Sequence, residues 1–219
     1  MIRSNNRIEL RGTCASAPLI SHSGRDEAFY TFPIAVLRLS GVTDTINVII
    51  REEAAKSGII SPGARLQVTG EIRSFNNKSG VGNRLVITVF AKRIEPSCDE
   101  DCNIVELAGT ICKPPVLRIT PMGREICDIM LAVNRRYGRS DYLPCIAWGH
   151  AAVAASNWVT GTKIRLSGRL QSRDYIKTAD GVSVQKTAFE VSVSEMEGQT
   201  EKSPPDGCAS GGSDIIRQD

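Results

Sequence analysis

The sequence predicts an all-β protein made of two tandem five-stranded Greek-key barrels, each with one short helix between its third and fourth strands. Three observations predict this fold class. The chain repeats itself at an offset of 97 residues, each copy contains five strand-like segments, and the second copy has an alanine-rich segment in the position of the helix. A chain of 219 residues is long enough for two small domains with separate cores.

The repeat can be read directly from the sequence. Residues 6–13, NRIELRGT, return as NIVELAGT at residues 103–110, and IAV at 34–36 returns as LAV at 131–133. After a shift of one residue, Gly63 and Gly70 correspond to Gly161 and Gly168. Two copies of one fold make their differences informative, because a residue needed only for folding should be kept in both.

The second copy has the clearer pattern of elements. Strands are expected at residues 103–112, 125–136, 142–148, 162–176 and 183–195, separated by turns rich in proline and glycine. The helix is expected at 151–158, where alanine dominates, and Gly161 follows it. Gly168 predicts a bend or bulge in the fourth strand. Five strands with one helix between the third and fourth is the element order of an OB-fold.

The first copy follows the same order. Strands are expected at residues 6–14, 29–39, 45–51, 64–75 and 84–94, with a shorter helix at 52–57. We therefore predict domains at 1–97 and 103–197, a linker at 98–102 and a tail at 198–219. The tail is rich in glycine, serine and proline and is expected to be disordered.

Charge is unevenly distributed along the chain, although the overall net charge is only +3. Both copies are basic, with net charges of +5 and +3, whereas the linker and the tail are acidic. This distribution is compatible with a polyanionic partner without requiring one. No apolar run is long enough to span a bilayer and the N-terminus has no apolar signal region, so a cytoplasmic, nucleoid-associated protein without a membrane partner is expected.

Seven cysteines give an odd count, and we expect reduced thiols, several of them acting as small core residues. A metal clip at Cys98 and Cys102 is the alternative, but no second cysteine pair follows at a zinc-site spacing. The two histidines are isolated, and there is no phosphate loop and no nucleophile–histidine pair. We therefore expect no catalytic residues, no metal and no cofactor, and hence not an enzyme.

The third strand of the second copy carries the first functional signal. By its period of two, Tyr142 and Trp148 point outward with Pro144 and Ile146, where a small barrel should be mostly polar. In the first copy the positions of the two rings hold Thr45 and Arg51. A requirement of the fold would have kept both copies aromatic, so these rings are expected to act beyond folding.

The second copy also adds cationic and aromatic residues that the first copy lacks. A row of arginines shares one side of the fourth strand and ends at Tyr175, and an arginine-rich loop around Tyr137 precedes the third strand. Guanidinium groups neutralise phosphates, and flat rings stack on bases with little sequence preference. The candidate nucleic-acid-binding residues are Arg135, Arg136, Tyr137, Arg139, Tyr142, Trp148, Arg165, Arg169, Arg173, Tyr175 and Lys177. Trp158 is assigned instead to packing of the helix on the barrel.

The second copy resembles the bacterial single-stranded DNA-binding protein family over about 95 residues. The stretches that carry the resemblance are 103–110, 131–137, 141–149, 161–175 and 186–193. The resemblance implies that Tyr137, Tyr142, Trp148 and Tyr175 stack on bases. The first copy resembles the family in its frame but has Ser40, Thr45, Arg51 and Asn77 at these places, with Phe75 nearby as a partial substitute.

The expected function is therefore sequence-independent, non-catalytic binding of single-stranded DNA in replication, recombination or repair. Family members generally present four barrels, so the resemblance implies a homodimer of this two-barrel chain. The family also tends to recruit replication and repair proteins through an acidic tip with an aromatic cap, and residues 213–219 do not have that composition. Two alternatives remain: an adaptor or oligomerisation module whose aromatic face binds protein, and an RNA-binding protein.

Overall fold

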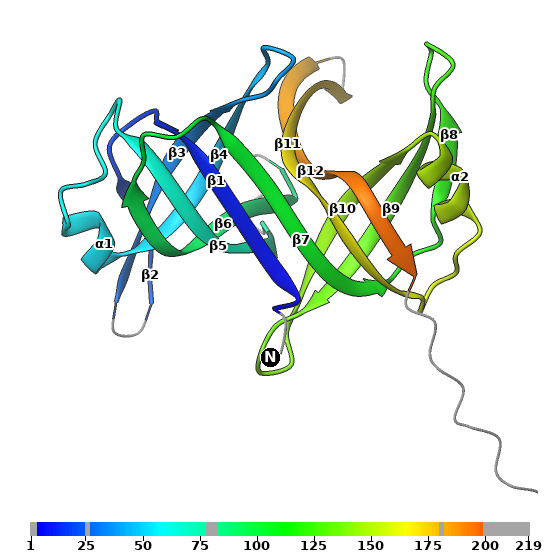
Figure 1. Cartoon of the computed structure of the whole chain (residues 1–219), viewed down its shortest axis with the longest axis horizontal. Helices are drawn as coiled ribbons and strands as arrows, with labels where there is room; N and C mark the ends of the chain where they lie inside the picture. Colours follow the sequence, from blue (N-terminus) through cyan, green and yellow to red (C-terminus); the bar gives the residue numbers. More distant parts are fainter. Residues whose placement is uncertain (1–3, 25–26, 78–82, 180–181, 199–219) are drawn as a thin grey trace, which may run out of the picture.

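The computed structural model describes residues 4–24, 27–77, 83–179 and 182–198. Figure 1 shows two barrels side by side, joined where a strand of one lies next to a strand of the other. The first barrel consists of β1 (Asn6–Cys14), β2 (Leu19–Ser23), β3 (Ala28–Leu37), β4 (Thr43–Arg51), α1 (Glu52–Lys56), β5 (Arg65–Asn76) and β6 (Leu85–Pro96). The second consists of β7 (Cys102–Ile111), β8 (Val116–Ile119), β9 (Glu125–Asn134), β10 (Ser140–Trp148), α2 (His150–Ser156), β11 (Lys163–Ala179) and β12 (Val182–Gly198).

Each barrel closes by the same set of strand pairs. In the first, β1 pairs with both β3 and β5, and a short parallel pairing of β4 with β6 completes the ring. In the second, β7 pairs with both β9 and β11, and β10 with β12 is the parallel pair. The helix follows the third long strand in both. This confirms the predicted class of two tandem OB-fold barrels, whereas the predicted domain boundaries remain predictions.

The structure adds one short strand to each barrel that the sequence did not predict. These strands, β2 and β8, pair only with β3 and β9 and lie at the two ends of the sheet order. All of their residues are exposed, so neither shows the alternation of buried and exposed positions that identifies a strand. The predicted disordered tail lies outside the described residues, apart from Gly198.

The core follows from the alternation that the sequence shows. Ile8 and Leu10 on β1 are buried, as are Val105 and Leu107 at the same places on β7. Trp158, after α2, packs partly buried against the core, which confirms its structural assignment. No helix in the described part of the chain is long and apolar enough to cross a membrane.

The two barrels are joined through their first strands. β1 and β7 pair antiparallel from Asn6↔Leu107 to Arg11↔Cys102, and Ile8 lies opposite its own counterpart, Val105. The pairing therefore relates the two copies by an approximate two-fold axis and makes one twelve-stranded sheet. The side chains of Asn6 and Asn103 bond the backbones of Ile72 and Leu170 in the same way, one in each barrel.

Four glycines repeat because the barrels leave no room for a side chain. A Cβ at Gly70 would overlap the carbonyl oxygen of Phe90, and one at Gly168 would overlap that of Ser192. Both glycines lie at the strand bulges, where the register shifts between β5 and β6 and between β11 and β12. Gly12 and Gly109 are crowded in the same way by the backbone of β3 and β9. The predicted bulge at Gly168 is thus present.

Substitution of Gly168 by alanine is expected to destabilise the protein by roughly 1–3 kcal/mol, because the strands must separate to admit the methyl group. Thermal unfolding of Gly168→Ala against wild type measures the effect. Ser167→Ala, one residue earlier and partly exposed, is the control and should change the free energy of unfolding by well under half of that. Equal stability of the two variants would contradict the crowding argument.

Candidate nucleic-acid interface

Strand β10 presents two aromatic rings to solvent. Tyr142 is 51% exposed and Trp148 is 39% exposed, whereas Leu143, Cys145 and Ala147 on the opposite side are buried in the core. Six residues of strand separate the two rings by about 20 Å, so one planar ligand does not reach both of them. Ile146, predicted to share the outward side, is buried, so the exposed face of β10 is interrupted between the rings.

The loop between β9 and β10 exposes a third ring. Tyr137 is 99% exposed and has a φ of 70°, the one positive φ at a non-glycine residue in the described part of the chain. Gly138 follows with a φ of 73°, and the loop is closed by Arg135 N–H donating to the carbonyl of Arg139 at 2.6 Å. Holding a tyrosine in the left-handed region costs about 1–3 kcal/mol, and such outliers cluster at functional sites. Arg136 and Arg139 on the same loop are exposed.

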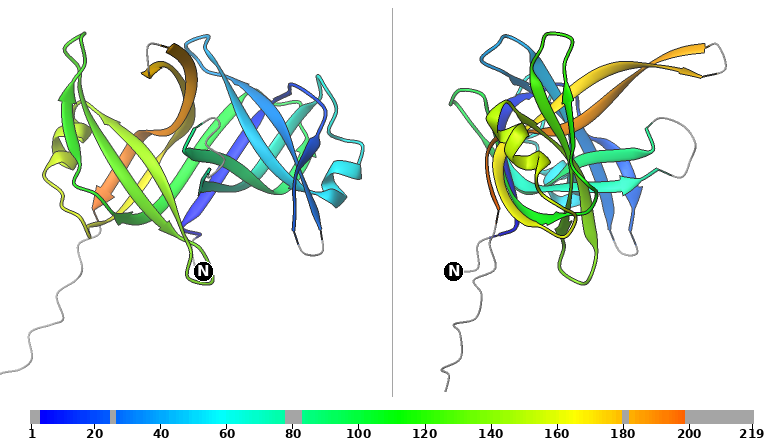
Figure 2. Two further views of the ribbon diagram at one scale, coloured as in Figure 1. Left: turned by 180° about the vertical axis from the view of Figure 1, so that it is seen from behind. Right: turned by 90° about the vertical axis from the view of Figure 1, so that its right-hand side faces the viewer.

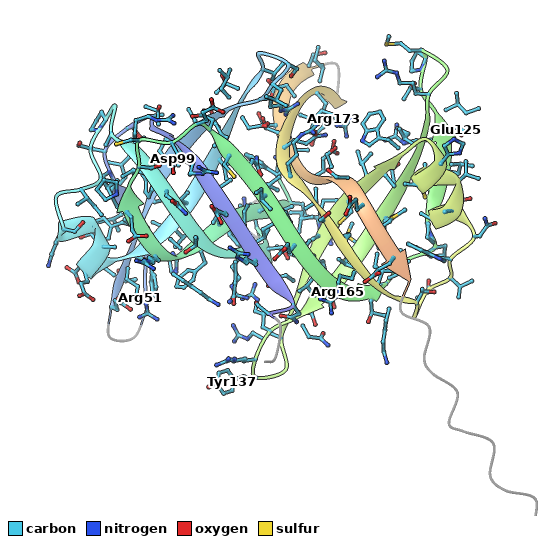
Figure 3. The ribbon with its side chains drawn as sticks, in the orientation of Figure 1. Arg51, Asp99, Glu125, Tyr137, Arg165 and Arg173 are labelled. Carbon is cyan, nitrogen blue, oxygen red and sulfur yellow. The ribbon has the colours of Figure 1, made fainter. Side chains whose placement is uncertain are left out.

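The β11–β12 hairpin carries the fourth ring on an arm that extends beyond the barrel (Figure 2). Tyr175 is partly exposed there, and Arg169 and Arg173 are exposed. Arg173 lies 3.6 Å from the buried carboxylate of Glu190, so part of its charge is balanced. Lys177 lies further along β11, and its side chain is outside what the structure describes. In Figure 3 Arg173 is at the top of the molecule and Tyr137 is at the bottom, on either side of the barrel.

Arg165 lies apart from the other candidate residues. It lies far from Arg173 along β11 (Figure 3), and it lines a hollow of about 640 Å³ on the outer face of the central strands. That hollow contains Glu106, Glu195 and Glu197 against only one further arginine, Arg7. Three carboxylates make this surface less favourable for phosphate than the rest of the predicted site, and a nucleic-acid contact by Arg165 stays a prediction.

Arg135 is largely engaged within the protein, and its predicted contact with phosphate stays a prediction. Its Nε atom donates to Asp141 at 2.7 Å and its Nη2 atom donates to the carbonyl of Ser74 in the first barrel at 3.1 Å. Asp141 is fully buried, accepts the backbone N–H of Ser74 at 2.5 Å and is also 3.2 Å from Arg73. Arg135 therefore ties its loop to β5 of the other barrel.

The same arrangement occurs in the opposite direction, as the approximate two-fold axis requires. Arg38 donates from Nε to the fully buried Asp44 at 2.6 Å and from Nη2 to the carbonyl of Ser172 at 3.3 Å. Asp44 also accepts from the N–H and the hydroxyl of Ser172, at 2.8 and 3.0 Å. We call these two groups the barrel clamps: Arg38–Asp44–Ser172 and Arg135–Asp141–Ser74.

Burial alone would raise the pKa of Asp44, but the hydrogen bonds from Arg38 and Ser172 and the charge of Arg38 outweigh it, so the pKa is lowered. Asp44 is therefore ionised near neutral pH. The ion pair between Asp44 and Arg38 requires this charge.

The clamps also position the aromatic strand. The hydroxyl of Ser74 accepts the backbone N–H of Tyr142 at 2.7 Å, so the first barrel fixes the start of the exposed face of β10. Ser74 and Asp141 were missed as functional residues. The signal for the carboxylates was present, because Asp44 and Asp141 lie at the repeat offset of 97, as do Arg38 and Arg135.

Comparison with known proteins agrees with this geometry. Residues 102–198 match the profile of the single-strand binding protein family. "Single-stranded DNA-binding protein 2" of Listeria innocua is 35% identical over 89 residues, which are 37% of this chain and 55% of that protein. "Single-stranded DNA-binding protein A" of Bacillus subtilis is 35% identical over 80 residues, 33% of this chain and 46% of that protein. The match thus spans about half the length of these relatives.

The two-barrel arrangement has a counterpart among solved structures. A deletion mutant of the single-stranded DNA binding protein from Thermus aquaticus aligns with a TM-score of 0.76 and 23% identity, over 94% of this chain and all of that one. The wild-type Thermus aquaticus protein aligns with a TM-score of 0.75 and 22% identity. The fold of both barrels is therefore shared. The second barrel, residues 102–198, is thus similar in sequence to the single-strand binding protein family, and both barrels share the fold of the Thermus aquaticus proteins.

Proposed function

We propose that this protein binds single-stranded DNA without sequence specificity and without catalysis, in replication, recombination or repair. The observation that carries the proposal is the exposed ring pair on β10, Tyr142 and Trp148, which the first barrel replaces by Thr45 and Arg51. Bases stack on such rings at roughly 1–3 kcal/mol each, with little dependence on which base is present.

Phosphate contacts supply the second part of the proposed binding. Arg136, Arg139, Arg169 and Arg173 are exposed around the rings, on the β9–β10 loop and on β11. Each phosphate neutralised on a single strand contributes about −0.7 to the slope of log affinity against log salt. Four such contacts give a slope of about −3.

Titration with oligo-dT tests both parts of the proposal. We expect quenching of Trp148 fluorescence and a salt slope of about −3, reduced by about 0.7 in Arg139→Ala. Arg165→Ala is the matched control, because Arg165 lies in the acidic hollow, and its slope should equal that of wild type. Absence of quenching, or quenching that is independent of salt, would contradict the proposal.

The proposed assembly is a homodimer with four barrels, which the family resemblance supports. Sedimentation equilibrium with and without oligo-dT measures the mass. If the ring pair instead bound protein, Trp148→Ala would dissociate the assembly and leave DNA affinity intact. Competition between DNA and RNA oligomers of equal length tests the sugar preference, because stacking alone distinguishes the two sugars poorly.

A further inference from the structure

The first barrel carries a groove of about 740 Å³ on the outward face of β3, β4, β5 and β6. This face corresponds to the one that displays Tyr142 and Trp148 in the second barrel, because Asn47 and Ile49 of β4 contribute to the floor. Its apolar lining comes mainly from Phe29, Ile49, Phe75, Val86 and Phe90. We call it the first-barrel groove.

Aromatic side chains form a row along this groove. The rings of His22 and Phe29 are stacked, 4.8 Å apart and 12° from parallel, and the ring of Phe29 lies 6.2 Å from that of Phe90. The guanidinium of Arg51 lies over Phe90, 6.0 Å from the ring centre. Phe75 is 53% exposed and has no ring partner among the described aromatic pairs, so its face is accessible.

These rings are specific to the first copy. Strand register aligns Phe29, Phe75 and Phe90 with Ile126, Arg173 and Ser192 of the second barrel. The first barrel thus lacks rings at the four positions of the second, yet it gathers three phenylalanines at other positions of the same face. About half of the Phe75 side chain is in water, so part of its ring is free to contact a ligand.

The groove is continuous with the aromatic face of the second barrel. Ser74 and Arg135 both line it, and the hydroxyl of Ser74 accepts the N–H of Tyr142 at 2.7 Å. Phe75 is the next residue along β5. An exposed ring of the first barrel therefore lies one residue away from the hydrogen bond between Ser74 and Tyr142.

The charge of the groove suits phosphate more than an acidic peptide. Its lining contains Arg73 and Arg135 and no carboxylate among the described residues. Three cations lie in or beside the groove at β5, and they form ion pairs with only two carboxylates, which leaves one positive charge in excess. The cations are Arg73, Arg135 and Lys92, and the carboxylates are Asp141 and Glu71.

We propose that the first-barrel groove binds nucleobases of the same single DNA strand that the second barrel holds, with Phe75 as the stacking platform. The proposal rests on the proposed function and extends it to a barrel that has lost the other ring positions. The bound strand then crosses from Tyr142 to Phe75 at Ser74, and both barrels contribute to the site size.

Affinity measured at two oligonucleotide lengths tests the groove. Oligo-dT of roughly 8 nucleotides fits one barrel, and oligo-dT of roughly 30 reaches both. Phe75→Ala should weaken binding of the long oligomer about 5- to 100-fold and leave that of the short one within two-fold. Phe75→Trp should restore long-oligomer affinity. Leu19→Ala, an exposed apolar side chain of β2 outside the groove lining, should match wild type at both lengths.

Photocrosslinking of the unaltered protein gives a second readout. A long oligomer containing 5-iodouracil should crosslink to peptides of β5 or β6 as well as to those of β10. The groove proposal would be overturned if Phe75→Ala bound the long oligomer as tightly as wild type and if crosslinks formed only to the second barrel. Normal quenching of Trp148 in the same experiments would leave the proposed function standing. If the groove bound a peptide instead of DNA, Phe75→Ala would likewise keep wild-type affinity for the long oligomer and crosslinks would form only to the second barrel. Loss of quenching and of all DNA affinity in wild type would instead overturn the proposed function.

Discussion

Replacing Tyr142 and Trp148 together by alanine is expected to weaken single-stranded DNA binding by roughly 2–6 kcal/mol, or about 30- to 25,000-fold. Each ring is about half exposed, so the free protein loses few contacts when the rings are removed. The loss should therefore appear in DNA affinity and leave the unfolding temperature nearly unchanged. Fluorescence anisotropy with a labelled oligo-dT, rather than quenching, measures the affinity, because Trp148 is removed.

Tyr142→Phe with Trp148→Phe is the matched control for this variant. It keeps two flat rings and removes only the hydroxyl and the indole nitrogen, so most of the affinity should remain. If the phenylalanine variant bound as weakly as the alanine variant, the polar atoms would be the source of affinity and stacking would not. An alanine variant with wild-type affinity would place the DNA away from β10.

The exposure of the rings was predictable because it follows from two patterns visible in the sequence, the alternation along one strand and the comparison of the two copies. Leu143 and Cys145 point into the core, so Tyr142 must point outward, and the comparison with Thr45 singles it out. Alternation failed at Ile146, which is buried although its parity is outward. The alternation along a strand tells which side of the sheet a residue faces. Whether that side is exposed or buried depends on elements that are distant in the sequence.

The arginines were harder to predict for the same reason. Arg165 and Arg173 share one parity of β11, but this strand is 17 residues long and strongly curved, so its two ends belong to different surfaces (Figure 1). Arg135 looked equivalent to Arg136 in sequence, yet its partner Ser74 is 61 residues away and belongs to the other barrel. Contacts between the barrels cannot be read from the periodicity of either one.

The barrel clamps predict the second large effect. Arg38→Ala is expected to destabilise the protein by about 3–5 kcal/mol, because it leaves the buried carboxylate of Asp44 without its ion-pair partner. The double variant Arg38→Ala with Asp44→Ala should lose less than the two single changes add up to, since no unpaired charge then remains. Chemical denaturation of the four proteins measures this coupling, and strict additivity would contradict it.

The lowered pKa of Asp44 adds a dependence on pH. Between the folded pKa and the ordinary value near 4, the unfolded chain binds more protons than the folded one, so stability falls as pH decreases through this window. Above pH 5 the contribution of Asp44 is fully present. Asp44→Asn should remove this part of the acid sensitivity, so its stability relative to wild type should improve as pH drops from 5 to 3.

The two clamps also differ in a way that separates their roles. In the described structure Asp44 is ion-paired with Arg38 alone, whereas Asp141 is paired with Arg73 as well as Arg135. Arg135→Ala therefore leaves Asp141 with a cation at 3.2 Å and should destabilise the protein less than Arg38→Ala. Arg135→Ala should instead act on DNA affinity, because it loosens the loop that presents Tyr137 and the start of β10. Equal loss of stability in the two variants, with DNA affinity unchanged in Arg135→Ala, would show that both clamps serve only to join the barrels.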